Sequence, residues 1–178
     1  GHSLVLARPS YGEGDPRAWA ASAWKGGSPG SAEPVPVGTL ENVVINEIFA
    51  HSDLPVTDFV ELHNHSLVSA DLSGCWLSDD PTTNKYRIPE GTVLPPRGFL
   101  AVDEAQLGFG LAADGETIYL VSSDNSRVLD CVRFEGQANG LCWGRVPDGG
   151  SDWRECSTRT PGTTNSPALR RDIVINEI

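Results

Sequence analysis

The sequence predicts an all-β protein built as an antiparallel β-sandwich. Short runs of β-branched and aromatic residues are separated by turn signals about every 8–12 residues. No window carries an apolar stripe with helical spacing. The chain also contains 19 Gly and 13 Pro in 178 residues, and both residue types favour the turns that such a fold needs.

The expected strands follow one another closely after residue 40. A short strand at 4–6 comes first, and a leader rich in Gly, Pro and Ser extends to residue 37. The further expected strands are 42–50, 58–64, 72–78, 86–88, 92–94, 98–103, 117–122, 127–134 and 141–146. Within 58–64 the side chains alternate, so that Val60 and Leu62 share one face.

One five-residue string occurs twice. Val44-Ile45-Asn46-Glu47-Ile48 returns as Val174-Ile175-Asn176-Glu177-Ile178, 130 residues later (174 − 44), which is the length of an ordinary domain. A looser echo has the same order: Leu4–Arg8, Trp19 and Ser28–Ser31 resemble Leu141–Arg145, Trp153 and Thr160–Thr163. The two echoes predict tandem modules: 1–37 ends a preceding module and adds a linker, 38–166 is a complete module, and 167–178 is a linker with the first strand of the next repeat.

Composition excludes some partners. The formal net charge is −11, with the acidic residues spread along the chain. Because binding of phosphate backbones needs a basic face, nucleic acid is not an expected partner. No apolar run approaches the roughly 20 residues of a membrane span, so we expect no direct membrane insertion.

Several short motifs in a fixed order resemble those of the lamin tail domain family, specifically its bacterial extracellular branch. They cover about residues 40–166: Ile45–Ile48, Asp58–Asn64, Asp71–Gly74, Leu77–Asp79, Ile88-Pro89, Gly98–Leu100, Thr117–Leu120, Leu129-Asp130, Gly144–Gly149 and Thr160–Asn165. Each motif is weak alone, but their order and spacing are specific.

The resemblance implies an immunoglobulin-like β-sandwich that acts as a non-catalytic binding or attachment module. It implies a place in a larger secreted or cell-surface bacterial protein, where the partners are a protein or cell-surface ligand and neighbouring modules of the same chain. The family often has Trp where this chain has Cys75, and Trp76 is shifted by one place. Since a shift of one residue exchanges the faces of a strand, we expect Trp76 to face solvent.

Four cysteines in an exported class of module predict disulfides. If the turn after Val146 is centred on Gly149, Cys142 and Cys156 face each other on two strands, within the Cα separation of a disulfide. Cys75 and Cys131 would form the second bridge by elimination. The alternative is four buried thiols, because free Cys is among the most buried residue types.

The oxygen-rich segment Asp79-Asp80-Pro81-Thr82-Thr83-Asn84 is a candidate calcium site, since calcium takes carboxylate and carbonyl oxygens from loops. Asp79 and Asp80 would be its ligands. The alternative is an ordinary solvated loop without a cofactor.

Five Trp in 178 residues raise the alternative of a carbohydrate-binding module, accessory to a secreted hydrolase or nuclease. Trp76 or Trp143 would then stack on a glycan. The competing interpretation places these rings in the core or in cross-strand pairs.

Catalytic interpretations have weaker support. Glu47 and Glu61 invite a hydrolase with two carboxylates, but the sequence has no nucleophile elbow and no phosphate-binding loop. His63-Asn64-His65 spells the name of a nuclease motif, yet adjacent strand side chains point to opposite faces. We therefore expect no enzymatic activity.

Overall fold

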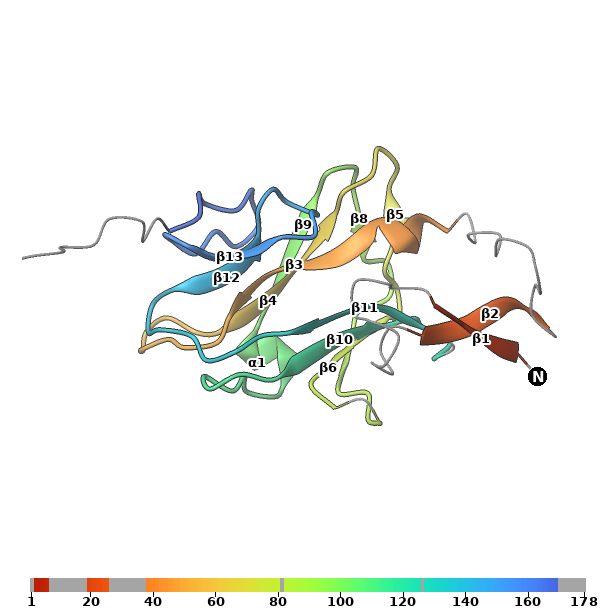
Figure 1. The fold of residues 1–178 in the computed structure, drawn as a ribbon, viewed down its shortest axis with the longest axis horizontal. Helices are drawn as coiled ribbons and strands as arrows, with labels where there is room; N and C mark the ends of the chain where they lie inside the picture. Colours follow the sequence, from red (N-terminus) through yellow and green to blue (C-terminus); the bar gives the residue numbers. More distant parts are fainter. Residues whose placement is uncertain (1, 7–18, 26–37, 81, 126, 170–178) are drawn as a thin grey trace, which may run out of the picture.

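A computed structural model describes residues 2–6, 19–25, 38–80, 82–125 and 127–169. Figure 1 shows two β-sheets packed as two layers. The larger sheet has the strand order β13-β12-β3-β4-β9 and the second has the order β11-β10-β6-β7. All the paired strands in both sheets run antiparallel, so the predicted fold class is confirmed.

The strands of the larger sheet are β3 (Val43–Phe49), β4 (Phe59–Asn64), β9 (Phe99–Asp103), β12 (Cys142–Arg145) and β13 (Trp153–Cys156). The strands of the second sheet are β6 (Trp76–Ser78), β7 (Tyr86–Arg87), β10 (Thr117–Val121) and β11 (Val128–Arg133). Two small antiparallel pairs complete the strands: β1 (His2–Leu6) with β2 (Trp19–Lys25), and β5 (Ala70–Asp71) with β8 (Val93–Leu94).

The core lies between the two sheets, where alternate residues of facing strands meet. The larger sheet contributes fully buried residues such as Ile45, Ile48 and Leu62. Leu77 and Leu120, which are register partners on β6 and β10, face them from the second sheet. This alternation is the reason that the period-2 pattern of the sequence locates the core correctly.

A β-bulge interrupts the pairing of β3 with β4. Ile45 pairs with Leu62 and Glu47 pairs with Glu61, so Asn46 is the extra residue. Because a bulge sets two residues against one, Asn46 and Glu47 both lie on the side away from the core. The sequence Ile45–Ile48 thus combines two core residues with two polar residues that face outward.

A buried ion pair joins the two layers at the bulge. Asp130 of β11 is fully buried and accepts hydrogen bonds from the Ile45 amide at 2.8 Å and from Arg145 Nη2 at 3.0 Å. Arg145 of β12 also donates from Nε to the Ile45 carbonyl at 2.7 Å. The backbone of Ile45 is therefore satisfied by side chains from both sheets.

Three details differ from the sequence-based expectations. Only β6 (Trp76–Ser78) forms within the expected strand 72–78, because Gly74 has a left-handed backbone (φ +72°), and β5 (Ala70–Asp71) lies before it. A short helix, α1 (Glu104–Leu107), has a capping box between Asp103 and Gln106. Strand β2 lies in the expected leader.

Other expectations were confirmed or were not tested. Trp76 is half-buried on the outer side of β6, while Cys75 and Leu77 are fully buried, as predicted from their alternation. The linker at 26–37 and the repeated strand at 173–178 lie outside the described residues. None of the helices in the described part of the chain is long and apolar enough to cross a membrane.

Candidate functional site: the covered face of the larger sheet and its groove

The larger sheet has an outer face, which points away from the core and is covered by the chain itself. After β13 the chain turns back along that strand (Figure 1), where Cys156 bridges Ala168 and the Leu169 amide donates to the Glu155 carbonyl at 2.7 Å. We call residues 157–166 the C-terminal cover, because its hydrogen bonds reach side chains of β3 and β4.

Two glutamates lie beneath the cover. Glu47 and Glu61 are register partners on β3 and β4, and neither is exposed to solvent. The Thr160 amide donates to both Glu47 oxygens at 3.0 and 3.2 Å, and the Thr160 hydroxyl donates to Oε2 at 3.0 Å. The Gly162 amide donates to Glu61 Oε2 at 2.6 Å. The carboxylates therefore hold the cover by its backbone.

Two asparagines extend this network. Asn46 donates from Nδ2 to Glu61 at 3.3 Å and to Asp148 at 3.0 Å. Asn165 donates from Nδ2 to the carbonyls of Asn46 at 3.1 Å and Arg145 at 2.9 Å. The bulge at Asn46 and the turn between β12 and β13 are thus tied to the cover by side chains.

Gly144 of β12 makes room for the Asn165 side chain. A Cβ at this position would lie 2.6 Å from Asn165 Nδ2 and 3.1 Å from Cys156 Sγ. Any larger residue would therefore require the Asn165 amide group to move from its place against the sheet.

Burial dominates the electrostatics of the two glutamates. Loss of solvent raises the pKa of Glu61 to about 8, against the lowering effect of the Gly162 and Asn46 hydrogen bonds; nearby Glu47 and Asp148 raise it further. Burial also raises the pKa of Glu47, mainly opposed by hydrogen bonds from Cys142 and Thr160. At neutral pH Glu61 is therefore mostly protonated.

A groove of about 750 Å³ opens beside the covered carboxylates. Its walls come from three segments: the turn after β3, the chain before β12, and the start of the cover. The lining residues are Phe49, Ser52, Asp53, Val56, Asn139, Gly140, Ser157, Thr158, Arg159 and Pro161. Its volume lies within the range of about 300–1,000 Å³ that is typical of ligand sites.

The groove contains an unpaired cation. The structure describes eight Arg and Lys side chains, and six of them form ion pairs with acidic side chains: Lys85, Arg87, Arg127, Arg133, Arg145 and Arg154. Within this described set, only Arg97 and Arg159 lack such a partner, and Arg159 lines the groove in an exposed position. Asp53, which also lines the groove, accepts from Asn139 Nδ2 at 2.7 Å.

Comparison with protein families shows which family this chain belongs to. The model of the Lamin Tail Domain matches residues 36–135, which is more than half of the 178 residues. The chain belongs to the lamin tail domain family. No curated protein matches the chain.

The match to the lamin tail domain ends just after β11. Strands β12 and β13 and the cover lie beyond residue 135. They nevertheless supply two of the five strands of the larger sheet and every backbone donor to Glu47 and Glu61 described above. In this lamin tail domain the C-terminal residues are therefore part of the sandwich.

The prediction that Cys142 faces Cys156 was correct, but the prediction that they form a disulfide was wrong. Cys142 and Cys156 are directly opposite on β12 and β13, as expected. All four cysteines of this lamin tail domain are nevertheless free and buried, so the described residues contain no disulfide. Cys142 donates from Sγ to the Thr158 carbonyl at 3.2 Å, and its hydrogen bond with Cys156, together with burial, raises the pKa of its thiol.

The second predicted bridge is excluded by topology. Cys75 immediately precedes β6, while Cys131 lies on β11, and β10 lies between these two strands. Two inter-strand spacings amount to roughly 9.6 Å, which exceeds the Cα separation of about 7 Å that a disulfide spans.

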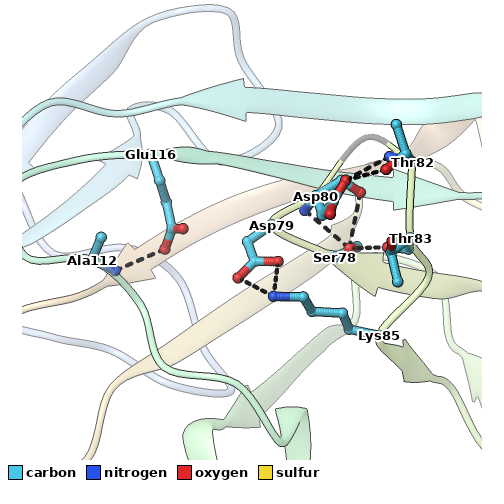
Figure 2. A network of polar contacts seen from close by, with 8 residues as sticks. All are labelled: Ser78, Asp79, Asp80, Thr82, Thr83, Lys85, Ala112 and Glu116. Carbon is cyan, nitrogen blue, oxygen red and sulfur yellow. Dashed lines mark hydrogen bonds and ion pairs between the residues drawn. The ribbon is translucent and has the colours of Figure 1, made fainter.

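The carboxylates of the candidate calcium segment are bound by the protein's own donors. Figure 2 shows that Asp79 points to Lys85, while Asp80 points to Thr82. Lys85 Nζ lies 2.6 and 2.7 Å from the two Asp79 oxygens, and Asp80 Oδ1 accepts from the Thr82 amide at 2.7 Å. Among the residues that the structure describes, no group of three His, Cys, Asp or Glu side chains is placed to hold a metal ion.

The two candidate aromatic residues differ in their surroundings. Trp143 pairs with Ile48 in register and packs against the core, although it is only partly buried. Trp76 lies on the outer side of the second sheet, with the Arg87 guanidinium carbon 5.9 Å from its ring centroid. Only Trp76 retains the position expected of an exposed platform.

The histidine segment serves the fold. The ring of His63 stacks on Phe99 with 4.2 Å between centroids, and His63 Nδ1 lies 3.1 Å from the Gly98 carbonyl. Asn64 Nδ2 donates to backbone carbonyls of the following loops, including Val68 at 2.7 Å. The sequence could not indicate the groove, because its residues come from three distant segments; Arg159 has no local signal at all.

Proposed function

We propose that this lamin tail domain is a non-catalytic interaction module of a larger secreted or cell-surface protein, and that it binds its partner in the groove lined by Arg159. The unpaired, exposed Arg159 in a chain that pairs most of its described cations is the observation that carries the proposal. A guanidinium in this position suits a carboxylate, which it binds through two parallel hydrogen bonds.

The partner that fits best is an extended peptide with a carboxylate next to an apolar side chain. Val56 and Pro161 offer apolar surface in the groove, which Arg159 also lines. Asp53, which also lines the groove, disfavours a ligand with several negative charges, such as a phosphate. A peptide with one acidic group therefore complements the groove better than a more highly charged anion.

The carboxylates argue for binding over hydrolysis. Glu47 and Glu61 are the pair that a two-carboxylate hydrolase would need, but both are fully buried and accept hydrogen bonds from the cover. A substrate would have to displace the cover before it reached either group. This supports a module without intrinsic catalysis.

A further role as a spacer between tandem modules rests on the sequence echo between the first hairpin and β12–β13. In β1–β2 the last residue of the first strand, Leu6, pairs with Trp19, which begins the second strand. In β12–β13 the last residue of the first strand, Arg145, pairs with Trp153, which again begins the second strand. The sequence echo sets Leu6 against Trp143, which pairs with Glu155, so the two registers differ by two residues. The interpretation of β1–β2 as the last hairpin of a preceding module therefore rests on the resemblance of the two sequences.

Selection from a display library of random heptapeptides tests the binding proposal. The full chain is compared with Arg159→Gln, and with Arg97→Gln as the matched control, because Arg97 is also exposed and unpaired in the described part but does not line the groove. We expect enrichment of peptides with an acidic residue beside an apolar one, lost in Arg159→Gln and kept in Arg97→Gln. No enrichment, or enrichment that survives Arg159→Gln, would refute the proposal.

The second candidate function is glycan binding by Trp76, which is supported by its half-exposed ring on the outer side of β6. A glycan array with the intact chain and with Trp76→Ala tests it, in the presence and absence of a chelator. Specific binding that disappears in Trp76→Ala would favour this candidate over the groove. Binding that also requires calcium would return the Asp79 segment to consideration.

A further inference from the structure

The C-terminal cover forms part of the groove wall and is held through two side chains. Ser157, Thr158, Arg159 and Pro161 of the cover line the groove. On either side of Pro161, the amides of Thr160 and Gly162 donate to Glu47 and Glu61. This part of the groove wall therefore depends on the state of the two carboxyl groups.

We propose that Glu47 and Glu61 form a pH-dependent latch, which holds the cover on the sheet while the pair retains a proton and releases it when both groups are ionised. The role of the latch in ligand binding rests on the proposed function of the groove. The latch itself rests on the geometry beneath the cover.

The two glutamates are not paired with a cation among the residues that the structure describes. The titratable groups that act on them are Asp148 of the β12–β13 turn, Cys142 of β12 and Cys156 of β13. His63 of β4 lies on the same face of the sheet as Glu61, Asp103 at the end of β9 caps α1, and Arg159 of the cover lines the groove. In the described part of the chain, neither Glu47 nor Glu61 forms an ion pair. Arg145, which is near in sequence to Asp148, is bound to Asp130 on the other side of the sheet.

When both groups are ionised, movement of the cover alone can relieve their repulsion and restore their hydration. Two charges on directly paired residues repel each other, and each loses hydration by burial. The carboxylates lie between the sheet and the cover, so water reaches them if residues 157–166 move away, while the strands remain paired. Burial raises the pKa of both groups, that of Glu61 to about 8, so the second charge appears in mildly alkaline solution.

Release of the cover would remove one wall of the groove. The interaction module would then bind its peptide below the pH at which the latch opens and lose it above. The thiol of Cys142, which donates to the Thr158 carbonyl of the cover, would become accessible in the same step.

Hydrogen–deuterium exchange of the full chain between pH 6 and pH 9 tests the latch without any ligand. After correction for the intrinsic exchange rate, we expect protection of residues 157–166 to fall about tenfold or more over this range, since one pH unit changes the ionised fraction by about that factor. Protection in β10 and β11 should stay constant. In Glu61→Gln, which cannot ionise at this position, protection of the cover should change less than in the wild type.

Glu116→Gln is the matched control. Burial also raises the pKa of Glu116, but this residue accepts from the Ala112 amide, away from the cover; its variant should retain the wild-type pH profile. Constant protection of the cover in the wild type, or an equal loss in all strands, would overturn the latch. If Glu61→Gln does not fold, Glu47→Gln serves the same purpose. A failed peptide selection would leave these exchange results unaffected.

Discussion

The buried carboxyl of Glu61 makes a quantitative prediction about stability and pH. Its pKa of about 8 in the folded chain compares with an ordinary value of 4.5. Between these two values the folded state binds more protons than the unfolded state, so the free energy of unfolding falls as pH rises through this window. At about 1.4 kcal/mol for each pH unit, the full effect is on the order of 5 kcal/mol, with hydration of a displaced cover reducing it.

The substitution Glu61→Gln removes this titration while keeping an acceptor for the Gly162 amide. We expect the variant to gain stability relative to the wild type as pH rises from 5 to 8.5. Urea unfolding followed by Trp fluorescence, at half-unit pH intervals, measures the difference. Curves for wild type and Glu61→Gln that stay parallel across this range would refute the assignment of a raised pKa to Glu61.

Three other changes test separate parts of the structure. Asp130→Asn leaves Arg145 buried without its charged partner and should cost about 3–5 kcal/mol in urea unfolding; a loss below about 1 kcal/mol would contradict the burial of this pair. Gly144→Ala should displace Asn165 and cost about 1–3 kcal/mol, with faster hydrogen exchange in the cover, whereas an unchanged exchange rate would show that the close contact is absent. A thiol titration in denaturant without reductant should find four free thiols per chain; two or none would restore the disulfide prediction.

The strands of this sandwich could be predicted from the sequence because each one carries its own signal. Alternation identified the core face of β4, with Val60 and Leu62 fully buried. The position of the turn at Gly149 was enough to predict the pairing of Cys142 with Cys156. The turn position could not predict whether Cys142 and Cys156 form a disulfide, because strand register determines the distance between two backbones and not whether two sulfurs are bonded.

The cover over the two glutamates depends on contacts between residues that are distant in the sequence, so the sequence alone could not predict it. Glu47 and Glu61 were noticed as a pair, but the sequence does not show that a segment about 100 residues away covers them. The bulge at Asn46 has no local signature either, because a polar residue within a strand also fits simple alternation. The helix α1 does have a local signature: Asp103 and Gln106 have the spacing of a capping box, a signal that does not depend on an apolar stripe.

The central claim is that this lamin tail domain keeps its paired glutamates for its own cover and contacts its partner in the groove beside them. An NMR titration of the ¹⁵N-labelled chain with a synthetic copy of the most enriched heptapeptide tests it most directly. We predict that the amide shifts concentrate at residues 52–56, 139–140 and 157–160. Shifts centred on Trp76 or on the β9 edge, or no shifts at all, would contradict the account.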